Sequence, residues 1–298
     1  MRIVFIADAF VQDGILGGGE LNNDELIKIL ASEDITIVKA RSDLVNLDFL
    51  KQEVTEKKSK LIIANFMNLQ LDCIHYLQEN AAHAWSECDY IIYEHDHKYL
   101  KGRNPALYEN FTAPKKDLLF KKFYENALAV FCQSQFHFDI LTRNLDIGNV
   151  VNLSGNLWSE ESLNMIEELS KKEKSDSCSI MDSDIPHKNT ADAIKFCKYK
   201  NWNYNLVRSA NYHDFLSKLG ANKRLIFFPK TPETLSRVAV EARMIGMEVI
   251  TNGLLGASKE EWYHKKGQEL INVMREKRKE IPNLVKNVFN ILSYNEEI

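Results

Sequence analysis

Three charged side chains in the last third of the chain have the spacing of one helical face. Glu233, Arg237 and Glu241 stand four residues apart within residues 225–252, which read LIFFPKTPETLSRVAVEARMIGMEVITN. From spacing alone, such a row is a solvated helix face with i,i+4 ion pairs. The alternative is chemical, because a helix start presents unpaired N–H groups and a positive dipole end to an anion.

A strand, a helix and a second strand are expected to position these residues. The runs 225–228 and 247–251 are short and apolar, and turn-forming residues end both of them, so we expect two buried strands. Between them, Thr231 is the expected cap of a helix that begins at Pro232 and ends at Gly246. In such a unit, ligands lie at the carboxyl ends of the strands, facing the helix start.

The same segment resembles the signature of a transferase family. Its pattern P-x-x-P-E-x-x-x-x-x-x-x-E-A is similar to the E-x7-E signature of group 1 (family 4-like) retaining nucleotide-sugar glycosyltransferases, which are two-domain GT-B enzymes. The resemblance implies that Glu233 contacts the donor sugar and that Glu241 holds the nucleotide ribose. It also implies that the diphosphate is received by backbone N–H groups between them, at Thr234, Leu235, Ser236 and Arg237. Family members often have glycines just after the first Glu, where this chain has Thr234 and Ser236.

A glycine-rich loop follows the first expected strand, residues 2–7. The run Gly17-Gly18-Gly19-Glu20 leads into a helix expected from about Leu21. Such a loop is a common turn device, and it lacks the G-x-G-x-x-G spacing of dinucleotide-binding loops. Within the resemblance, Gly18, Gly19 and Glu20 form a G-G-x-E-like loop whose backbone amides face the sugar-diphosphate across the interdomain cleft.

A dense polar cluster, Glu94-His95-Asp96-His97, follows the apolar run 90–93. An extended backbone would point His95 and His97 to one face, which would suit a metal, but no third distant ligand accompanies them. A hydrogen-bonded turn at a strand end is a second interpretation. The resemblance favours a third, a catalytic site without a metal in which His95, Asp96 or His97 faces the donor or the acceptor.

The diphosphate needs cations, and the second half of the chain offers several. The loop 182–189 resembles the family's strand-loop-helix that carries an Arg and a Lys, and Lys188 fits the lysine. Acids replace the arginine expected four or five residues earlier. The cation pair must therefore be completed by Arg208, Lys230 or Arg237.

Between residues 98 and 124, basic and aromatic residues are interleaved, and only Glu109 and Asp117 oppose the positive charges. The cations are Lys98, Lys101, Arg103, Lys115, Lys116, Lys121 and Lys122. Such a segment suits a phosphate backbone or peripheral contact with an anionic membrane. For residues 117–129 an amphipathic helix with its aromatic side in the core is the alternative. Residues 98–116 have no clear period and are expected to be a loop that meets the acceptor.

Composition excludes several classes of protein. The 298 residues carry a net charge of −4, which argues against a globally basic nucleic-acid binder. Five cysteines without a C-x-x-C pair indicate neither a disulfide framework nor a zinc finger, and they favour a reducing compartment. No apolar run is long enough for a signal peptide or a membrane span, so we expect a cytoplasmic protein, peripheral at the membrane at most.

Alternating strand and helix patterns predict an α/β protein with parallel sheets. Further strands are expected at 35–38, 61–64 and 129–132, and near Ser179 and 205–207. The sequence predicts a GT-B architecture with two Rossmann-like domains facing across a cleft. The expected parts are an acceptor-side domain at 1–155, a nucleotide-sugar domain at 178–265, and a helix at 266–298 that returns toward the first domain.

The resemblance implies transfer of a sugar, with retention, from a nucleoside diphosphate sugar that is UDP- or GDP-linked. No further cofactor is expected. The acceptor would be a lipid-linked glycan, a polysaccharide or a nucleic acid with a modified base. The alternative is a catalytically degenerate GT-B module that binds a nucleotide without turnover.

Overall fold

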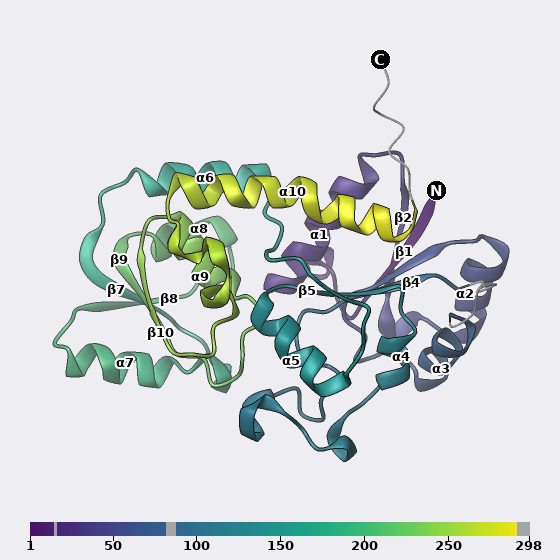
Figure 1. Cartoon of the computed structure of the whole chain (residues 1–298). Coiled ribbons are helices and arrows are strands. Elements are labelled where there is room, and N and C mark those ends of the chain that lie inside the picture. Colours follow the sequence, from purple (N-terminus) through teal and green to yellow (C-terminus); the bar gives the residue numbers. More distant parts are fainter. Residues whose placement is uncertain (15–16, 82–87, 291–298) are drawn as a thin grey trace.

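Two parallel sheets stand side by side, each flanked by helices (Figure 1). The computed structural model describes residues 1–14, 17–81 and 88–290. The first sheet has the strand order β2-β1-β3-β4-β5-β6, and the second has the order β10-β9-β7-β8. All of these neighbours pair in parallel, as expected when each strand is followed by a crossover through a helix.

The first sheet is made of short apolar strands because helices cover both of its faces. Its strands are β1 (Arg2–Ala7), β2 (Thr36–Arg41), β3 (Lys60–Ile63), β4 (Tyr90–Tyr93), β5 (Ala129–Cys132) and β6 (Val150–Asn152). Its helices are α1 (Gly18–Ala31), α2 (Leu47–Lys51), α3 (Leu71–Asn80), α4 (Lys121–Glu125) and α5 (Gln135–Leu145). The strands predicted at 2–7, 90–93 and 129–132 are confirmed at both ends, whereas α1 begins at Gly18 and not near Leu21.

The second sheet contains the strand, helix and strand predicted for residues 225–252. Its strands are β7 (Ser175–Met181), β8 (Tyr204–Val207), β9 (Asn222–Phe227) and β10 (Glu248–Thr251). The helices that accompany it are α6 (Glu160–Ser170), α7 (Thr190–Tyr199), α8 (Tyr212–Leu219), α9 (Arg237–Met244) and α10 (Gln268–Val288).

The helix predicted to begin at Pro232 begins five residues later. The N–H of Glu233 donates to the carbonyl of Leu254 at 2.8 Å, and the N–H of Gly256 donates back to the carbonyl of Glu233 at 2.9 Å. These bonds hold the segment before α9 in an extended form beside residues 254–257, as a parallel bridge between Glu233 and Leu255. Glu233 therefore does not share a helix face with Arg237 and Glu241.

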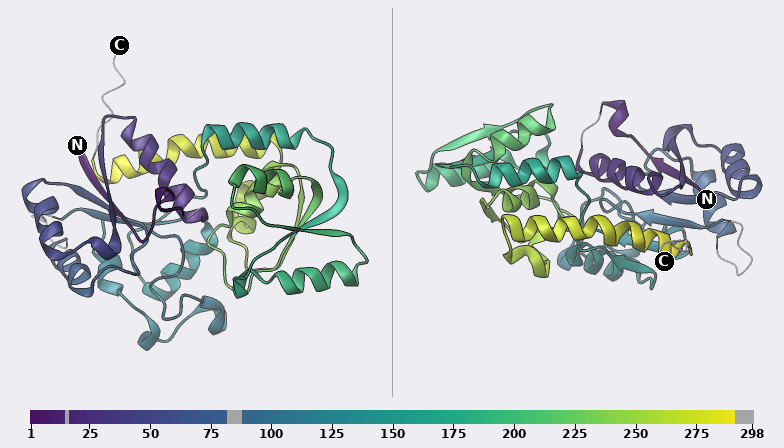
Figure 2. Two further views of the ribbon diagram at one scale, coloured as in Figure 1. Left: turned by 180° about the vertical axis from the view of Figure 1, so that it is seen from behind. Right: turned by 90° about the horizontal axis from the view of Figure 1, so that it is seen from above.

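Helix α10 connects the two halves of the molecule (Figure 2). Leu270 and Met274 pack in the core under the second sheet, whereas Ile281 and Val285 pack in the core of the first. Helix α6, which follows the first domain in sequence, packs along α10 and adds its apolar side to the second core. Residues 291–298 of the predicted C-terminal helix lie outside the described part of the chain. Within that part, no helix combines the length and the apolar composition that a bilayer span requires.

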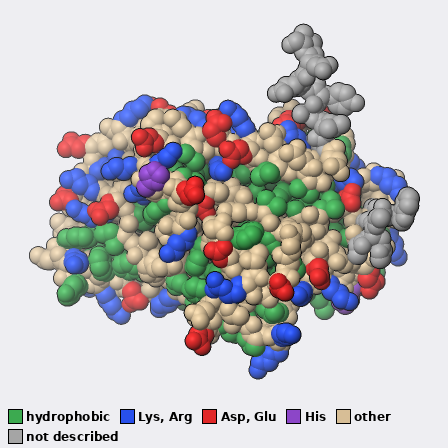
Figure 3. Space-filling model, viewed as in Figure 1, with side chains coloured by type: hydrophobic (Ala, Val, Ile, Leu, Met, Phe, Trp, Pro, Cys, Tyr) green, Lys and Arg blue, Asp and Glu red, His purple; other side chains and the backbone are tan. Residues whose placement is uncertain are grey.

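Residues 99–119 form a loop that projects at the lower edge of Figure 1. A single antiparallel bridge between Leu100 and Leu118 closes its base. Figure 3 shows Lys and Arg side chains on this projection with acidic atoms beside them, and charges of both signs are interspersed over the rest of the face. The predicted loop over most of 98–116 is confirmed as irregular structure with short 3-10 turns.

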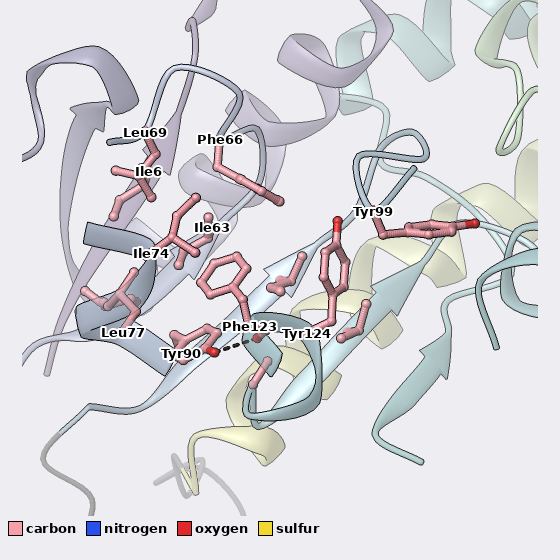
Figure 4. Close-up of a cluster of buried hydrophobic side chains, with 14 of the residues drawn as sticks. Ile6, Ile63, Phe66, Leu69, Ile74, Leu77, Tyr90, Tyr99, Phe123 and Tyr124 are labelled. Carbon is pink, nitrogen blue, oxygen red and sulfur yellow. Dashed lines mark hydrogen bonds between the residues drawn. The ribbon is translucent and has the colours of Figure 1, made fainter. Parts of the chain in front are cut away.

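An aromatic cluster anchors the base of this loop (Figure 4). The Phe123 ring lies 5.2 Å from that of Phe66 and is stacked on that of Tyr90 at 5.1 Å, and Tyr90 Oη donates to the carbonyl of Phe123 at 2.6 Å. Tyr124 is also buried and donates to the Glu94 carboxylate. The helical alternative for this segment, with its aromatic side in the core, is therefore confirmed for α4.

Lys98 belongs to this interior and not to the surface of the basic segment. Its side chain is 1% exposed, and Nζ lies 2.7 Å from Glu94 Oε1 and 3.3 Å from Asp96 Oδ1. Burial raises the pKa of Glu94, whereas the neighbouring carboxylates raise the pKa of Lys98 against the effect of its own burial. The expectation that Lys98 contacts a polyanion is wrong, because its ammonium group is enclosed with its counter-ions.

We predict that Lys98→Met lowers the free energy of unfolding by about 3–5 kcal/mol, because it leaves the Glu94 carboxylate buried without its cation. Urea denaturation at pH 7 measures the change. Lys101→Met, at an exposed position of the same loop, is the control and should change stability by less than about 0.5 kcal/mol. Equal stability of the two variants would contradict the assigned role of the buried pair.

Candidate active site

A cavity of about 470 Å³ lies between the two domains. The first domain contributes the glycine loop at 17–19 and the residues that follow β4 and β5. The second domain contributes the loops after β7 and β8, the extended segment before α9, and α9 itself. The cavity thus lies at the carboxyl ends of the strands, where parallel α/β sheets bind their ligands.

Of the polar cluster after β4, His95 is the member that lines the cavity. Its Nδ1 lies 2.5 Å from Gln133 Nε2 and its Nε2 lies 2.6 Å from Asn23 Oδ1, so Nδ1 accepts and Nε2 donates. Burial, and then the positive charge of Lys98, lower the pKa of His95 to about 3. The ring is therefore neutral at physiological pH, with both nitrogens engaged, and it does not act as a general base.

The glycine loop brings α1 against both walls of the cavity. A Cβ built on Gly18 would lie 3.1 Å from Arg237 Cδ, and one built on Gly19 would lie 3.5 Å from His95 Cγ. The glycines thus allow the first turn of α1, with its unpaired N–H groups, to approach residues of both domains closely. Glu20 does not line the cavity, and its carboxylate folds back over Gly17.

Glu233 and Lys188 form an ion pair at one end of the cavity. Lys188 Nζ lies 2.8 Å from Glu233 Oε1 and 5.7 Å from the centre of the Phe227 ring. The loop at 254–257 fixes Glu233, and Gly256 makes that possible, since a Cβ there would lie 2.4 Å from the carbonyl oxygen of Thr234. Sequence analysis placed both charged residues at the donor site, and the structure brings them together.

Glu241 lies at another part of the cavity wall, where it is 2% exposed. Its Oε1 accepts hydrogen bonds from Trp158 Nε1 at 2.9 Å and from Tyr212 Oη at 2.6 Å. Arg237 Nε lies 3.5 Å from the same oxygen. Among the described residues, Oε2 accepts no hydrogen bond. One carboxylate oxygen is thus held by the protein, and the other remains able to accept from a ligand.

Arg237 is the second cation of the cavity. Its guanidinium group stacks 4.4 Å from the centre of the Trp158 ring, and Nη1 donates to the carbonyl of Leu157 at 2.5 Å. Nη2 lies 3.4 Å from Tyr212 Oη, and the side chain also touches the glycine loop. This residue therefore contacts the first domain, the interdomain connection and α8 at once.

Thr234 and Ser236, both predicted at the donor site, also line the cavity, whereas Asp96, His97, Arg208, Lys230 and Leu235 do not. Asp96 faces Lys98 and Arg103, and His97 is buried with Nδ1 2.9 Å from Tyr99 Oη. Arg208 is 60% exposed and pairs with Asp184 at 2.7 Å. Asp184 is one of the acids in the loop 182–189, where the resemblance led us to expect an arginine. Two further candidates, Lys230 and Leu235, lie respectively on the surface and in the core.

Sequence analysis missed several residues that shape the cavity. Gln133 follows β5 at its carboxyl end, so the rule that selected His95 after β4 would have selected it as well. Asn156 and Trp158 come from the connection between β6 and α6, and Tyr212 begins α8; none of them carries a sequence motif. Their proximity to Glu241 or to the glycine loop follows from tertiary packing alone.

The donor set of the cavity suits an anionic organic ligand. Within residues 1–14, 17–81 and 88–290, no group of three or more His, Cys, Asp or Glu side chains is arranged to hold a metal ion. The cavity combines two carboxylates, two cations and the starts of two helices, α1 and α9. A ligand with an anionic centre between hydroxyl-bearing ends would match this arrangement.

Comparison with known proteins identifies the architecture. No protein-family model matches the chain, and no curated protein matches its sequence. The structure is similar to that of Anabaena HepE in complex with UDP and glucose, with a TM-score of 0.52 and 12% identity over 98% of this chain and 97% of HepE. The chain has the GT-B fold. The two Rossmann-like domains predicted from sequence are thereby confirmed.

Two further solved structures match the chain at low sequence identity. HepE in complex with UDP has a TM-score of 0.52 and 14% identity over 98% of this chain and 97% of that one. An α-glucosyltransferase in complex with UDP-glucose and DNA containing an abasic site has a TM-score of 0.48 and 11% identity, covering 98% of this chain and 93% of its own.

We predict that His95 does not titrate between pH 5 and 8, because its pKa of about 3 lies below this range. Nitrogen-15 NMR of the imidazole ring would show one protonated nitrogen, Nε2, and one unprotonated nitrogen throughout. The exposed ring of His213 provides the internal comparison. A midpoint for His95 above pH 5 would contradict the hydrogen bonds assigned to its two nitrogens.

Proposed function

We propose that this protein is a glycosyltransferase that moves a sugar from a nucleoside diphosphate sugar, UDP- or GDP-linked, to an acceptor. One observation carries the proposal: Glu233 and Glu241 line the same interdomain cavity together with the cations Lys188 and Arg237. This is the arrangement that the E-x7-E resemblance requires. The GT-B fold provides the interdomain cleft for it.

The nucleotide end of the donor is assigned to Glu241. Trp158 and Tyr212 hold one carboxylate oxygen, which orients the second oxygen to accept hydrogen bonds from the two ribose hydroxyls. The apolar side chains of Met181 and Phe215 line the same cavity and offer a surface for the base. HepE, which has the same fold, binds UDP, so UDP is the first nucleotide to test.

The diphosphate is assigned to the middle of the cavity. The first N–H groups of α1 at Gly18 and Gly19 and those of α9 offer hydrogen bonds to phosphate oxygens. Lys188 and Arg237 supply positive charge from two different elements. In sugar transfer the diphosphate leaves with the bonding electrons, so charge that develops on its oxygens in the transition state is stabilised by these groups.

The sugar end is assigned to Glu233 and His95. Glu233 accepts from the sugar hydroxyls, and the neutral His95 ring contributes to the cavity wall from the first domain. Because His95 is neutral and Glu233 is paired with Lys188, the site relies on leaving-group stabilisation and positioning more than on a strong base. The resemblance to the retaining E-x7-E enzymes supports transfer with retention.

The acceptor is assigned to the loop at 99–119, which lies outside the cavity lining and is joined to the residues after β4. Arg103 of this loop pairs with Asp96, which directly follows His95. Lys101, Arg103, Lys115 and Lys116 are exposed. An acceptor that carries phosphates, either a nucleic acid or a lipid-linked glycan at an anionic membrane, would be attracted by these charges, whereas a neutral polysaccharide would not.

We predict that Glu241→Gln weakens UDP or GDP binding by about 1–3 kcal/mol, the range for losing hydrogen bonds to a charged group. Isothermal titration calorimetry of the folded variant measures this. Glu248→Gln, which removes an exposed carboxylate on β10, is the control and should leave the dissociation constant unchanged. An unchanged constant in the Glu241 variant would remove the ribose assignment.

We predict that binding of a phosphate-bearing acceptor weakens steeply as salt rises, because each phosphate contact releases counter-ions. Duplex DNA, single-stranded DNA and anionic vesicles should be compared across a salt series. The test variant carries Ala at Lys101, Arg103, Lys115 and Lys116, and Lys98 is left intact because it is buried.

DNA binding that is lost in this variant would identify a nucleic-acid acceptor, and vesicle binding lost in the same way would identify a lipid-linked one. UDP binding should survive in the variant, since none of the four side chains lines the cavity. Absence of both interactions at low salt in the wild type would contradict a phosphate-bearing acceptor and leave a neutral glycan.

A further inference from the structure

Ser236, the residue that precedes α9, has an unfavourable backbone conformation. Its φ is 78° and its ψ is 90°, in the region that glycine adopts readily and that other residues rarely adopt. The resembling enzymes often have glycine in this stretch, and the backbone here has kept the glycine-like conformation with a serine in place. A non-glycine residue persists in such a conformation only where the surrounding structure enforces it, and such residues cluster at ligand sites.

Ser236 stands at the N-cap position of α9, but its hydroxyl group does not cap the helix. A serine there ordinarily accepts a hydrogen bond from the N–H of the second or third helical residue, but no such bond forms at α9. Ser236 is 8% exposed, and its Oγ is buried without a hydrogen-bond partner in the described part of the chain. Buried hydroxyl groups nearly always have a partner in folded proteins.

The next residue repeats this pattern. Arg237 Nε is also buried without a hydrogen-bond partner among the described residues, although Glu241 lies within ion-pair distance. Ser236, Arg237 and Val238 all line the cavity. The helix start therefore presents together a hydroxyl without a hydrogen-bond partner, a guanidinium N–H whose ion-pair partner Glu241 lies 3.5 Å away, and uncapped backbone N–H groups. All of them donate, and a phosphate oxygen only accepts, so one diphosphate would satisfy them all.

We infer that the Ser236 hydroxyl donates a hydrogen bond to the diphosphate of the donor, in addition to the backbone contacts expected there. The inference rests on the function proposed above, and it assigns a specific side chain where the resemblance implied backbone groups alone. The strained backbone directs the hydroxyl away from the helix end that it would otherwise cap. Ser236 is thus a donor-affinity residue in this chain.

Two substitutions at Ser236 separate ligand binding from structural stability. Ser236→Gly removes the hydroxyl and relieves the positive φ, so its melting temperature should equal or exceed that of the wild type. Its affinity for UDP and for inorganic pyrophosphate should nevertheless fall by about tenfold or more, the loss expected for one hydrogen bond to a charged group. Ser236→Ala should lose affinity equally without the gain in melting temperature.

Uridine, which has no phosphate, should bind wild type and both variants alike, and calorimetry measures all three ligands. Ser258→Ala is the matched control, because that hydroxyl donates to the carbonyl of Leu255 and does not line the cavity. Variants that bind UDP as tightly as the wild type, or that lose uridine as well as UDP, would overturn the role of Ser236 and leave the proposed function intact. A wild type that binds neither UDP nor GDP would instead overturn the proposed function, and this inference with it.

Discussion

The cavity depends on one buried contact between the domains, made by Thr234. Its Oγ1 lies 2.9 Å from the His95 carbonyl and 2.9 Å from Gln133 Oε1, and its own carbonyl accepts from Ser134 Oγ at 2.5 Å. The residues after β4 and β5 are thereby fixed against the segment before α9. Because this contact is buried and hydrogen-bonded, it sets the separation of His95 from Glu233, and with it the width of the site.

The rest of the molecule supports this contact from both sides. Residues 254–257 hold the Thr234 segment extended, and Gly256 is required because its Cα lies too close to the neighbouring carbonyls for any side chain. On the far side, α10 packs in both cores, and Arg278 joins it to Glu25 of α1 at 2.5 Å. The relative position of the two domains is thus fixed both at the cavity and at the surface. This suits a site whose functional groups come from several elements.

The sequence predicted the strands well because short apolar runs in a parallel sheet have few alternatives. It predicted the start of α9 wrongly, since the cap signal at Thr231 and Pro232 is local, whereas the pairing of Glu233 with Leu255 is tertiary. His95, Lys188 and Glu241 were found because each carries a motif or follows a strand. Trp158 and Tyr212 were not found, because neither has a local signal. Lys98 was misplaced since a charged residue in a basic stretch is usually exposed, and its buried partner Glu94 cannot be recognised from spacing.

The central claim is that the cavity binds a nucleoside diphosphate sugar and activates its glycosidic bond. The most direct measurement is NMR of the purified protein with a panel of UDP- and GDP-linked sugars, which follows both the release of nucleoside diphosphate and the configuration of the sugar first set free. We expect that one donor is slowly hydrolysed in the absence of acceptor, and that the released sugar has the anomeric configuration of the donor. A released sugar of inverted configuration would contradict the retaining course, and a protein that neither binds nor hydrolyses any of these donors would contradict the account as a whole.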